Sequence, residues 1–181
     1  MSLASTHREE RIRRVRDTFI MLVWAAMRQF SQELQCFGLT LPQFVALAAL
    51  VAHREPCTMR HLTEVTLQDP PTMTGIVDRL VKMSLVKRTR VETDRRLVLV
   101  QATPAGTDLL TRIRNEALEA TMTDYVTLTN VEEAKADRWL EYFEQALEFV
   151  LRAQLKRRDL ADADLDAQIE KIRLFLTEPV G

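Results

Sequence analysis

Residues 58–102 constrain the fold of this chain most strongly, because they begin with two short helical patterns separated by a tight turn. The first pattern, TMRHLTEVTL, starts at Thr58, whose hydroxyl can cap a helix. The turn LQDPP leads into the second pattern, PPTMTGIVDRLVKM, where Asp69 is a favourable N-cap and Pro70 suits the first helical position. Two short helices joined by a turn predict a helix-turn-helix.

Two strand-like runs follow the second helical pattern. Residues 85–91 and 96–102 are rich in Val and Leu and alternate in part, and residues 92–95 join them. Helix restarts after this hairpin, with Thr103 as a cap and Pro104 at the first helical position. The order helix, helix, hairpin predicts a winged helix-turn-helix, in which the hairpin is the wing.

Long amphipathic helices are predicted on both sides of this unit. Apolar residues recur at steps of three and four across residues 8–36, and FGLT then breaks the pattern, with Gly38 as a C-terminal cap. A mostly apolar helix starts at Pro42, and two further helices are predicted at about 104–126 and 130–156. The chain has 46% apolar residues and only four glycines, which is typical of a helical domain with a core. We therefore expect a mainly α fold with a small β-hairpin wing.

The start of the second helix and the tip of the wing carry residues that suit DNA. The N-terminal end of a helix presents N–H groups and partial positive charge to phosphates, and in a helix-turn-helix it also reaches base edges. The residues at that end are Pro71, Thr72 and Thr74. An arginine at a wing tip can enter the minor groove while an aspartate holds its guanidinium, which suits Asp94, Arg95 and Arg96. A charged loop tip can also be simply solvated, but other basic residues nearby favour DNA: Lys82, Lys87, Arg88 and Arg90.

Charge and hydropathy patterning bound the class of protein. Residues 54–96 carry nine Lys and Arg against six Asp and Glu, whereas residues 129–181 carry eight against twelve, in a chain of net charge −1. A locally basic module fits nucleic-acid contact. No run of about 18 uncharged apolar residues is present, and no cleavage-site pattern follows the basic start, so we expect no membrane span and no signal peptide. Two cysteines, Cys36 and Cys57, then favour free thiols in a reducing cytoplasm.

Several motifs stand in order between residues 39 and 110, namely LTLPQF, DPPTMTGIVDRL, LVKR, Asp-x-Arg and ATPAG. Together they resemble the MarR (multiple antibiotic resistance regulator) family of bacterial transcriptional regulators. The resemblance implies a homodimer in which the first and last helices intertwine. It divides the chain into an N-terminal dimerisation helix, a winged helix-turn-helix, C-terminal dimerisation helices and an extra amphipathic tail helix, at residues 1–40, 41–102, 103–156 and 157–181.

The resemblance also implies roles for particular residues. Arg96 would be the minor-groove residue with Asp94 as its partner, and Thr58 and Arg88 would lie near phosphates. Pro71, Thr72 and Thr74 would face the major groove of a palindromic operator. We expect a repressor, without a cofactor, that a small lipophilic or aromatic effector releases from DNA. The alternative is a winged-helix protein–protein interaction module without specific DNA binding.

Three positions depart from the family pattern. Gly75 stands where a basic residue often follows the threonine, which removes a possible DNA contact and costs roughly 1 kcal/mol of helix propensity relative to Ala. Ser84 replaces the glycine that usually ends this helix, so its cap should be weaker or differently shaped. Leu97 follows Arg96 where a serine is common.

The family's effectors bind between the dimerisation helices and the winged domain. An arginine near aromatic rings could hold an anionic aromatic ligand there. The candidates are Trp24, Met27, Arg28, Phe44 and His53. The competing interpretation is that Met, Phe and Trp at helical spacing simply form the core.

Other chemistry has little support in the sequence. Cys36 and Cys57 could sense oxidants, but neither matches the sensing cysteine of peroxide regulators, and we expect both to be small packed residues. The three histidines are too scattered for metal-ligand spacing. No phosphate loop, nucleophile elbow or His-Glu-x-x-His motif is present, so we expect no enzyme.

The last segment spaces its apolar residues as one more amphipathic helix, with Leu165, Ile169, Ile172 and Leu176 on one face. This face must be covered, since a large exposed stripe is rare in a soluble monomer. It could extend the dimer interface or fold over the winged domain, and the first is the simpler expectation.

Overall fold

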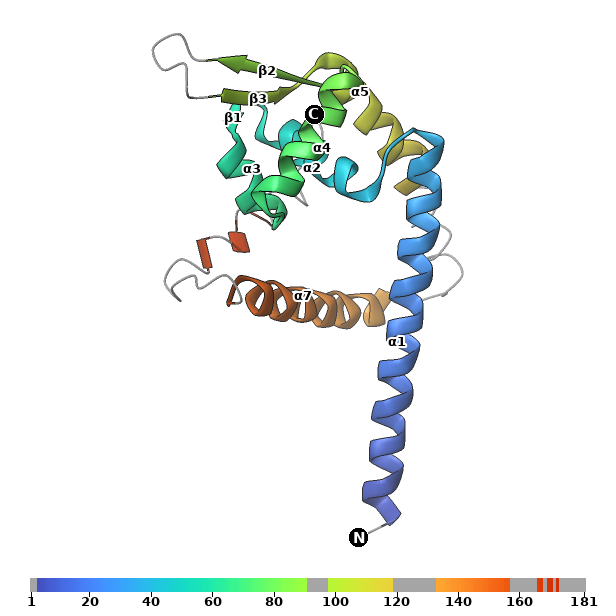
Figure 1. Cartoon of the computed structure of the whole chain (residues 1–181). Helices are drawn as coiled ribbons and strands as arrows, with labels where there is room; N and C mark the ends of the chain where they lie inside the picture. The colour runs from blue at the N-terminus through green and yellow to red at the C-terminus, as the bar shows by residue number, and fades with distance from the viewer. Residues whose placement is uncertain are drawn as a thin grey trace. The chain divides into compact units, whose positions relative to one another are not determined.

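The computed structural model describes residues 3–90, 98–118 and 133–156, together with residues 166, 167, 169, 170 and 172 (Figure 1). The chain divides into two compact units, Met1–Leu41 and Pro42–Gly181. Within the described residues, no single helix is both long and apolar enough to cross a membrane, and only α1 and α2 taken together reach that length and hydropathy.

The first unit consists of one long helix, α1 (Leu3–Cys36). It ends as predicted at Gly38, whose φ of 72° lies in the left-handed region. The amide of Gly38 donates to the Gln35 carbonyl and the amide of Leu39 donates to the Leu34 carbonyl, both at 3.0 Å. These two bonds satisfy carbonyls that the helix end leaves open, which makes a Schellman cap. Glycine is favoured here because it adopts a positive φ without steric cost.

The second unit opens with a winged helix-turn-helix. Its elements are α2 (Leu41–His53), β1 (Cys57–Thr58), α3 (Met59–Thr66), α4 (Pro70–Lys82), β2 (Val86–Arg90) and β3 (Val98–Ala102). The predicted mainly helical fold with a β wing is confirmed. The described strands are shorter than the predicted runs, and residues 91–97, including the predicted hairpin tip, lie outside the described residues.

The sheet contains one strand that the sequence did not predict. β1 pairs antiparallel with β3, and β3 pairs antiparallel with β2, so the order is β1-β3-β2. Cys57 lies opposite Val100, and Val86 lies opposite Ala102. A strand of two residues is too short to show an alternating pattern in the sequence. β1 forms because it pairs with β3, which lies about 40 residues further along the chain.

A single core holds the helix pair against the sheet. α2 is apolar on nearly every side, as its sequence predicted, and its residues Ala46 to Val51 are all buried. The other fully buried side chains of this core come from α3, α4, β3 and α5, and include Leu62, Met73, Val77, Leu80, Val100, Leu110 and Ile113. Each such side chain contributes about 1.5–3 kcal/mol relative to exposure, so the core fixes how α4 is presented.

The junction between α4, the wing and α5 (Pro104–Ile113) is closely packed. Ser84 has a φ of 61° and replaces glycine in a second Schellman cap, with its amide on Val81 and that of Leu85 on Leu80. Thr103 caps α5 as predicted by accepting from the Gly106 amide at 3.1 Å. It also donates from its own amide to the Leu85 carbonyl at 3.0 Å and from its hydroxyl to the Ser84 carbonyl at 2.8 Å.

The C-terminal helices only partly follow the prediction. A helix was predicted over residues 104–126, but α5 ends at Ile113 and continues as a π-helix over Arg114–Leu118, and residues 119–132 lie outside the described residues. α7 (Glu133–Lys156) is long, as predicted. The described tail residues Ile169 and Ile172 are buried with Leu151 and Leu155 of α7. These described tail residues therefore pack within their own chain, and the expectation that the tail extends the dimer interface stays a prediction.

Candidate nucleic-acid interface

Side-chain caps position both helices of the helix-turn-helix. The Thr58 hydroxyl accepts from the His61 amide at 3.1 Å, and an Asp69 carboxylate oxygen accepts from the Thr72 amide at 2.9 Å. Both caps were predicted, and both residues have the extended backbone that an N-cap needs. Between them Leu67 ends α3 with a φ of 55°, in the left-handed region. The turn between α3 and α4 is thus fixed at its start by the left-handed backbone of Leu67 and at its end by the Asp69 cap.

The N-terminal end of α4 presents exposed side chains but no spare backbone amides. Pro71, Thr72 and Thr74 are exposed, whereas Met73 and Val77 on the opposite face are buried. The two prolines that open the helix have no N–H, the Thr72 amide is held by the Asp69 carboxylate, and the Met73 amide donates to the Asp69 carbonyl at 2.9 Å. The prediction that this end offers N–H groups to phosphate is therefore wrong, because prolines and the cap remove them. Contact with a ligand must come from side chains, and the Thr74 hydroxyl already donates to the Pro70 carbonyl at 2.9 Å.

The described part of the wing is basic and exposed. In β2 only Val86 is buried, while Lys87, Arg88 and Arg90 are exposed, as is Lys82 at the end of α4. These are the positions that the sequence analysis assigned to DNA. Asp94, Arg95 and Arg96 lie outside the described residues.

Arg88 has a structural partner that the sequence did not indicate. Its guanidinium donates to the Asp78 carboxylate of α4, and its side chain is 33% exposed. The ion pair joins the wing to α4 across ten residues of sequence, a separation that no helix or hairpin spacing would flag. Gln101 of β3 makes a second link, because its side-chain amide donates to the Arg54 carbonyl at 3.2 Å. The wing is thus tied through β2 to α4 and through β3 to the loop that follows α2.

Gly75 lies on the exposed face of α4. A Cβ built on it would meet no atom within 4 Å, so a larger side chain has room there. The space that a basic residue would occupy in the family pattern is therefore present and empty of protein atoms.

The effector candidates fall on both units, and each unit is described by itself. On α1, Trp24 and Met27 are exposed, and the Arg28 guanidinium lies 5.7 Å from the Trp24 ring centroid. This is a cation–π contact between two residues of one helix, and it places an arginine beside an aromatic ring, as the effector hypothesis needs. Phe44 is half-buried on α2, and His53 is exposed at its end. The five residues stay a prediction as a binding site.

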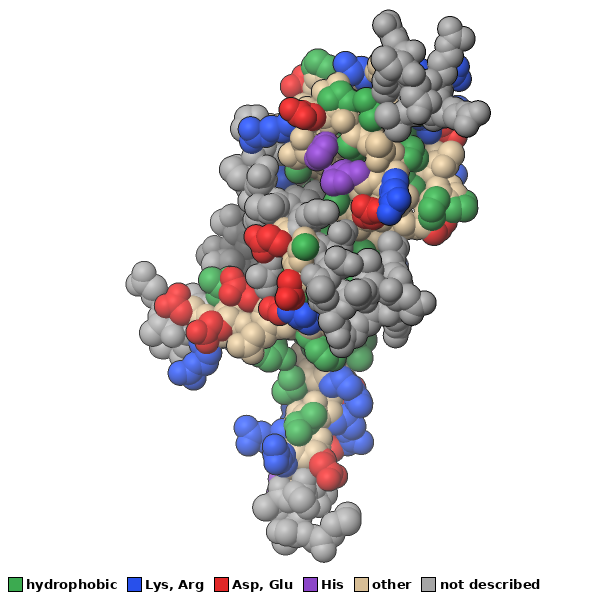
Figure 2. Space-filling view, turned by 90° about the vertical axis from the view of Figure 1, so that its left-hand side faces the viewer, with side chains coloured by type: hydrophobic (Ala, Val, Ile, Leu, Met, Phe, Trp, Pro, Cys, Tyr) green, Lys and Arg blue, Asp and Glu red, His purple; other side chains and the backbone are tan. Residues whose placement is uncertain are grey.

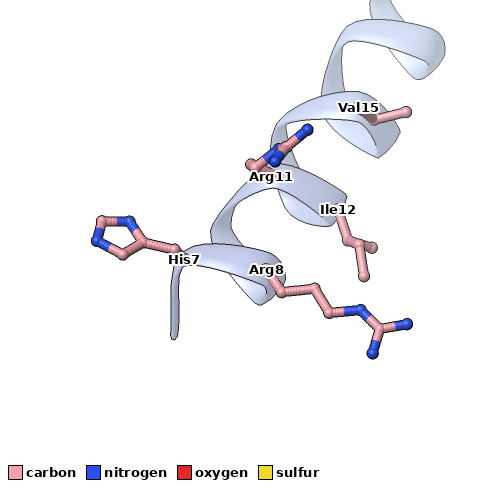
Figure 3. Close-up of a pocket in the computed structure, with 5 residues that line it drawn as sticks. All are labelled: His7, Arg8, Arg11, Ile12 and Val15. Atoms are coloured by element: carbon pink, nitrogen blue, oxygen red, sulfur yellow. The ribbon is translucent and has the colours of Figure 1, made fainter. Parts of the chain in front are cut away.

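A hollow on the surface occurs elsewhere on α1, at its N-terminal end (Figure 3). The residues that line it are His7, Arg8, Arg11, Ile12 and Val15. All five come from the first turns of one helix, and none is an effector candidate. Figure 2 shows basic side chains (blue) on this part of the chain, next to hydrophobic ones (green).

Two histidines that are eight residues apart in sequence meet in space. The ring centroids of His53 and His61 lie 4.5 Å apart, and the pair is visible in purple in Figure 2. The end of α2 and the first turn of α3 bring them together, which sequence spacing could not show. No group of three or more metal-ligating side chains occurs among the described residues, so the pair lacks the third ligand of a usual zinc site.

The two cysteines differ in their surroundings. Cys57 is buried in β1, and burial raises the pKa of its thiol to about 11, which keeps it protonated near neutral pH. Cys36 is exposed, and its thiol contacts the Gln32 carbonyl at 3.8 Å. The prediction of a small packed residue is confirmed for Cys57 and wrong for Cys36, because Cys36 lies in the last turn of a helix whose solvent side it occupies.

Known proteins match this chain in the region of the winged helix-turn-helix. A sequence profile of the MarR family matches residues 37–97. The organic hydroperoxide resistance transcriptional regulator of Bacillus subtilis (strain 168) is 32% identical over 89 residues, which cover 47% of this chain and 60% of that protein. The HTH-type transcriptional repressor NicR of Pseudomonas putida is 42% identical over 72 residues, 40% of this chain and 45% of that protein. The chain thus spans about half the length of these two relatives.

Solved structures share the fold over most of the chain. The YusO protein from Bacillus subtilis has a TM-score of 0.64 at 19% identity, covering 76% of this chain and 95% of its own. A mutant MarR from E. coli, complexed with operator DNA, has a TM-score of 0.60 at 22% identity, covering 75% and 94%. Bordetella bronchiseptica BpsR, whose DNA binding is regulated by 6-hydroxynicotinic acid, has a TM-score of 0.57 at 23% identity, covering 73% and 91%. By its winged helix-turn-helix fold, its sequence profile over residues 37–97 and its relatives, this chain is similar to the MarR family of transcriptional regulators.

Proposed function

We propose that the protein is a dimeric, sequence-specific DNA-binding repressor. The observation that carries this proposal is that one domain presents both the exposed N-terminal end of α4 and an exposed basic strand, β2, which an ion pair joins to α4. A helix end of this kind fits the major groove, and basic strands of a wing follow the phosphate backbone. The mutant MarR with operator DNA and the repressor NicR support the proposal by their fold and sequence.

In this proposal, side chains of α4 contact the DNA, and backbone amides do not. Because the prolines and Asp69 leave no spare N–H at the start of α4, Thr72 and the exposed face around Gly75 are the groups that meet the bases. Lys82, Lys87 and Arg90 then meet phosphates, and Arg96 enters the minor groove with Asp94 as its partner. Arg88 acts mainly by holding the wing to α4 through Asp78.

Dimerisation is supported by apolar surface on the long helices. Nine large hydrophobic side chains are exposed on α1 between Ile12 and Met27. α7 exposes a further row at helical spacing, Leu140, Phe143, Leu147 and Val150. Surfaces of this size are rarely left in water by a soluble protein, and a second copy of the chain would cover both.

Effector control is supported by relatives and by Trp24 and Arg28. BpsR responds to an aromatic acid, and the guanidinium over an indole ring in α1 suits a ligand of that chemistry. We propose that an aromatic acid bound near these residues releases the protein from DNA. The site of action would be the cytoplasm, where its DNA lies.

Titration onto the DNA that flanks its own gene tests the function, with unrelated DNA as competitor and at two salt concentrations. We expect specific binding whose logarithmic salt slope is about −0.9 for each phosphate neutralised. Arg96→Ala should weaken binding while light scattering still reports a dimer. Binding no tighter than to the competitor, in every salt, would instead favour the protein–protein interaction module.

A further inference from the structure

Two imidazole rings lie side by side on the surface of the winged domain. The ring centroids of His53 and His61 are 4.5 Å apart, and the two ring planes make an angle of 40°. His53 is exposed and His61 is half-buried, and Figure 2 shows both rings (purple) open to the viewer. An ion with its bound water can therefore reach the pair from solvent.

The backbone around the two histidines is held in place by other contacts. His53 is the last residue of α2, and His61 lies in the first turn of α3, where its amide donates to the capping hydroxyl of Thr58 at 3.1 Å. Between them, β1 pairs with β3, and the Arg54 carbonyl accepts from the Gln101 side chain at 3.2 Å. A site whose ligands are already held close together loses less entropy when it binds an ion.

The spacing of the rings suits two ligands of one metal ion. Metal–nitrogen bonds of about 2.0–2.1 Å, with each ring centre about 1.1 Å behind its nitrogen, place two centroids about 4.5 Å apart at a right angle and about 5.2 Å apart at the tetrahedral angle. The observed 4.5 Å matches the right angle. Right angles between ligands occur in the square-planar and tetragonal complexes of Cu²⁺ and Ni²⁺, whereas zinc prefers a tetrahedron.

Imidazole is the ligand that this part of the chain supplies. Each ring has two nitrogens, so one nitrogen can bind the ion while the other keeps a hydrogen bond. Cys57 lies between the two histidines in sequence, but burial raises the pKa of its thiol to about 11, so it offers no thiolate near neutral pH. Glu64, one turn after His61, is bound by Arg60 at 2.9 Å. Among the described residues, no third metal-ligating side chain completes the group.

We propose that His53 and His61 form a two-nitrogen site for a divalent transition-metal ion of the Ni²⁺ or Cu²⁺ type, with water in the remaining positions. The site uses none of the residues proposed to meet DNA, and it goes beyond the proposed function. A bound ion joins the end of α2 to the start of α3, across the loop that β3 contacts through β1 and Gln101. The ion stabilises the winged domain, because a ligand that binds the folded state shifts the unfolding equilibrium.

The test titrates Ni²⁺ onto the full-length protein by calorimetry near pH 7.5, where imidazole is neutral. The protein is untagged, since affinity tags bind the same ions, and carries Cys36→Ser throughout, since the exposed Cys36 thiol could compete for metal. The chain has three histidines, so His7→Gln on α1 is the matched control for His53→Gln and His61→Gln. Either substitution in the pair should weaken binding by at least about tenfold, because even the outer partners of metal ligands change affinity by about 10–100-fold. The control should bind one Ni²⁺ per chain, as the parent does.

Two further measurements report the site independently. At ten times the dissociation constant, Ni²⁺ should raise the midpoint of thermal unfolding by about 3–6 °C in the parent and the control, and by less in the two pair variants. Electron paramagnetic resonance of bound Cu²⁺ should show coupling to two nitrogens in the control and to one in either variant.

Three results would each overturn the site. They are equal Ni²⁺ affinity for His53→Gln and the control, no binding at about 1 mM Ni²⁺, and a Ni²⁺-dependent rise in particle mass by light scattering, which would mean a bridge between copies. No DNA is used, so these results do not depend on the proposed function.

Discussion

Gly106 and Gly75 are both helical glycines, yet replacement by alanine should have opposite effects on stability. A Cβ on Gly106 would lie 2.3 Å from the Leu85 carbonyl oxygen and 3.1 Å from a methyl carbon of Leu47. A Cβ on Gly75 would meet nothing within 4 Å. The chemical change is identical at the two sites, so the difference between them isolates the cost of the close approach.

The magnitude at Gly106 follows from the atoms involved. Contacts under 3.0 Å are not seen for real Cβ atoms, so the Leu85 carbonyl or the start of α5 must move by about 0.7 Å, the difference between 3.0 Å and 2.3 Å. That carbonyl also accepts from the Thr103 amide, and the shift strains this bond. Overpacking destabilises the fold by about 1–3 kcal/mol, and a weakened hydrogen bond destabilises it by about 0.5–1.5 kcal/mol. The higher helix propensity of alanine offsets up to about 1 kcal/mol of this loss. We expect Gly106→Ala to destabilise the fold by about 2 kcal/mol.

At Gly75 only the propensity term remains, so Gly75→Ala should stabilise the fold by about 0.5–1 kcal/mol. The assay is urea unfolding followed by far-UV circular dichroism, at one fixed protein concentration because a dimer gains stability with concentration. In thermal scans the changes correspond to about 4–8 °C down for Gly106→Ala and about 1–4 °C up for Gly75→Ala. A Gly106→Ala protein as stable as the native one would refute the steric reasoning, and a destabilised Gly75→Ala protein would refute the open face.

Three further predictions concern the face of α4 around Gly75, the cap at Ser84 and the two cysteines. Gly75→Lys should tighten DNA binding and steepen the logarithmic salt slope by about one, measured by anisotropy with Gly75→Ala as control; an unchanged slope would place this face away from phosphates. Ser84→Gly should raise the free energy of unfolding by about 1 kcal/mol in urea, because the φ of 61° is costly for serine, whereas no gain would mean that serine is not strained there. A thiol reagent at pH 8 should label Cys36 rapidly and Cys57 only on unfolding. Because the pKa of Cys57 is raised from 9.0 to about 11, its contribution to stability is full below pH 9 and is lost as the pH rises to 11; rapid labelling of both thiols at pH 8 would contradict its burial.

Local sequence signals predicted the elements of the winged domain well. Thr58, Asp69 and Thr103 each cap the helix that follows them, and Gly38 ends α1, as expected. Such signals act within three or four residues, because a cap or turn bonds to its own neighbours. The sequence also showed that Ser84 stands where a glycine usually ends this helix. In the structure, Ser84 adopts the left-handed conformation that glycine would take.

The residues of the candidate site stay a prediction, and one part of the chemistry given to them was wrong. The exposed positions of α4 and β2 are those expected, but the role given to backbone amides was wrong. Pro70, Pro71 and Asp69 are helix-start signals, and the same three residues leave no free N–H group at the start of α4. The ion pair of Arg88 with Asp78 was missed because both residues looked like solvated charges at unrelated spacing.

What the sequence determined by itself was therefore the helices and the two strands of the winged domain and its charged surface, since periodicity, caps and turn residues are local. The tertiary structure decided the rest: the β1 pairing with β3, the His53 and His61 contact, the close approach at Gly106, and the docking of Ile169 and Ile172 near Leu67. Each of these joins residues from separate elements, and their distances depend on how the core packs. An amphipathic pattern shows that a face must be covered, but only the packed chain shows which surface covers it.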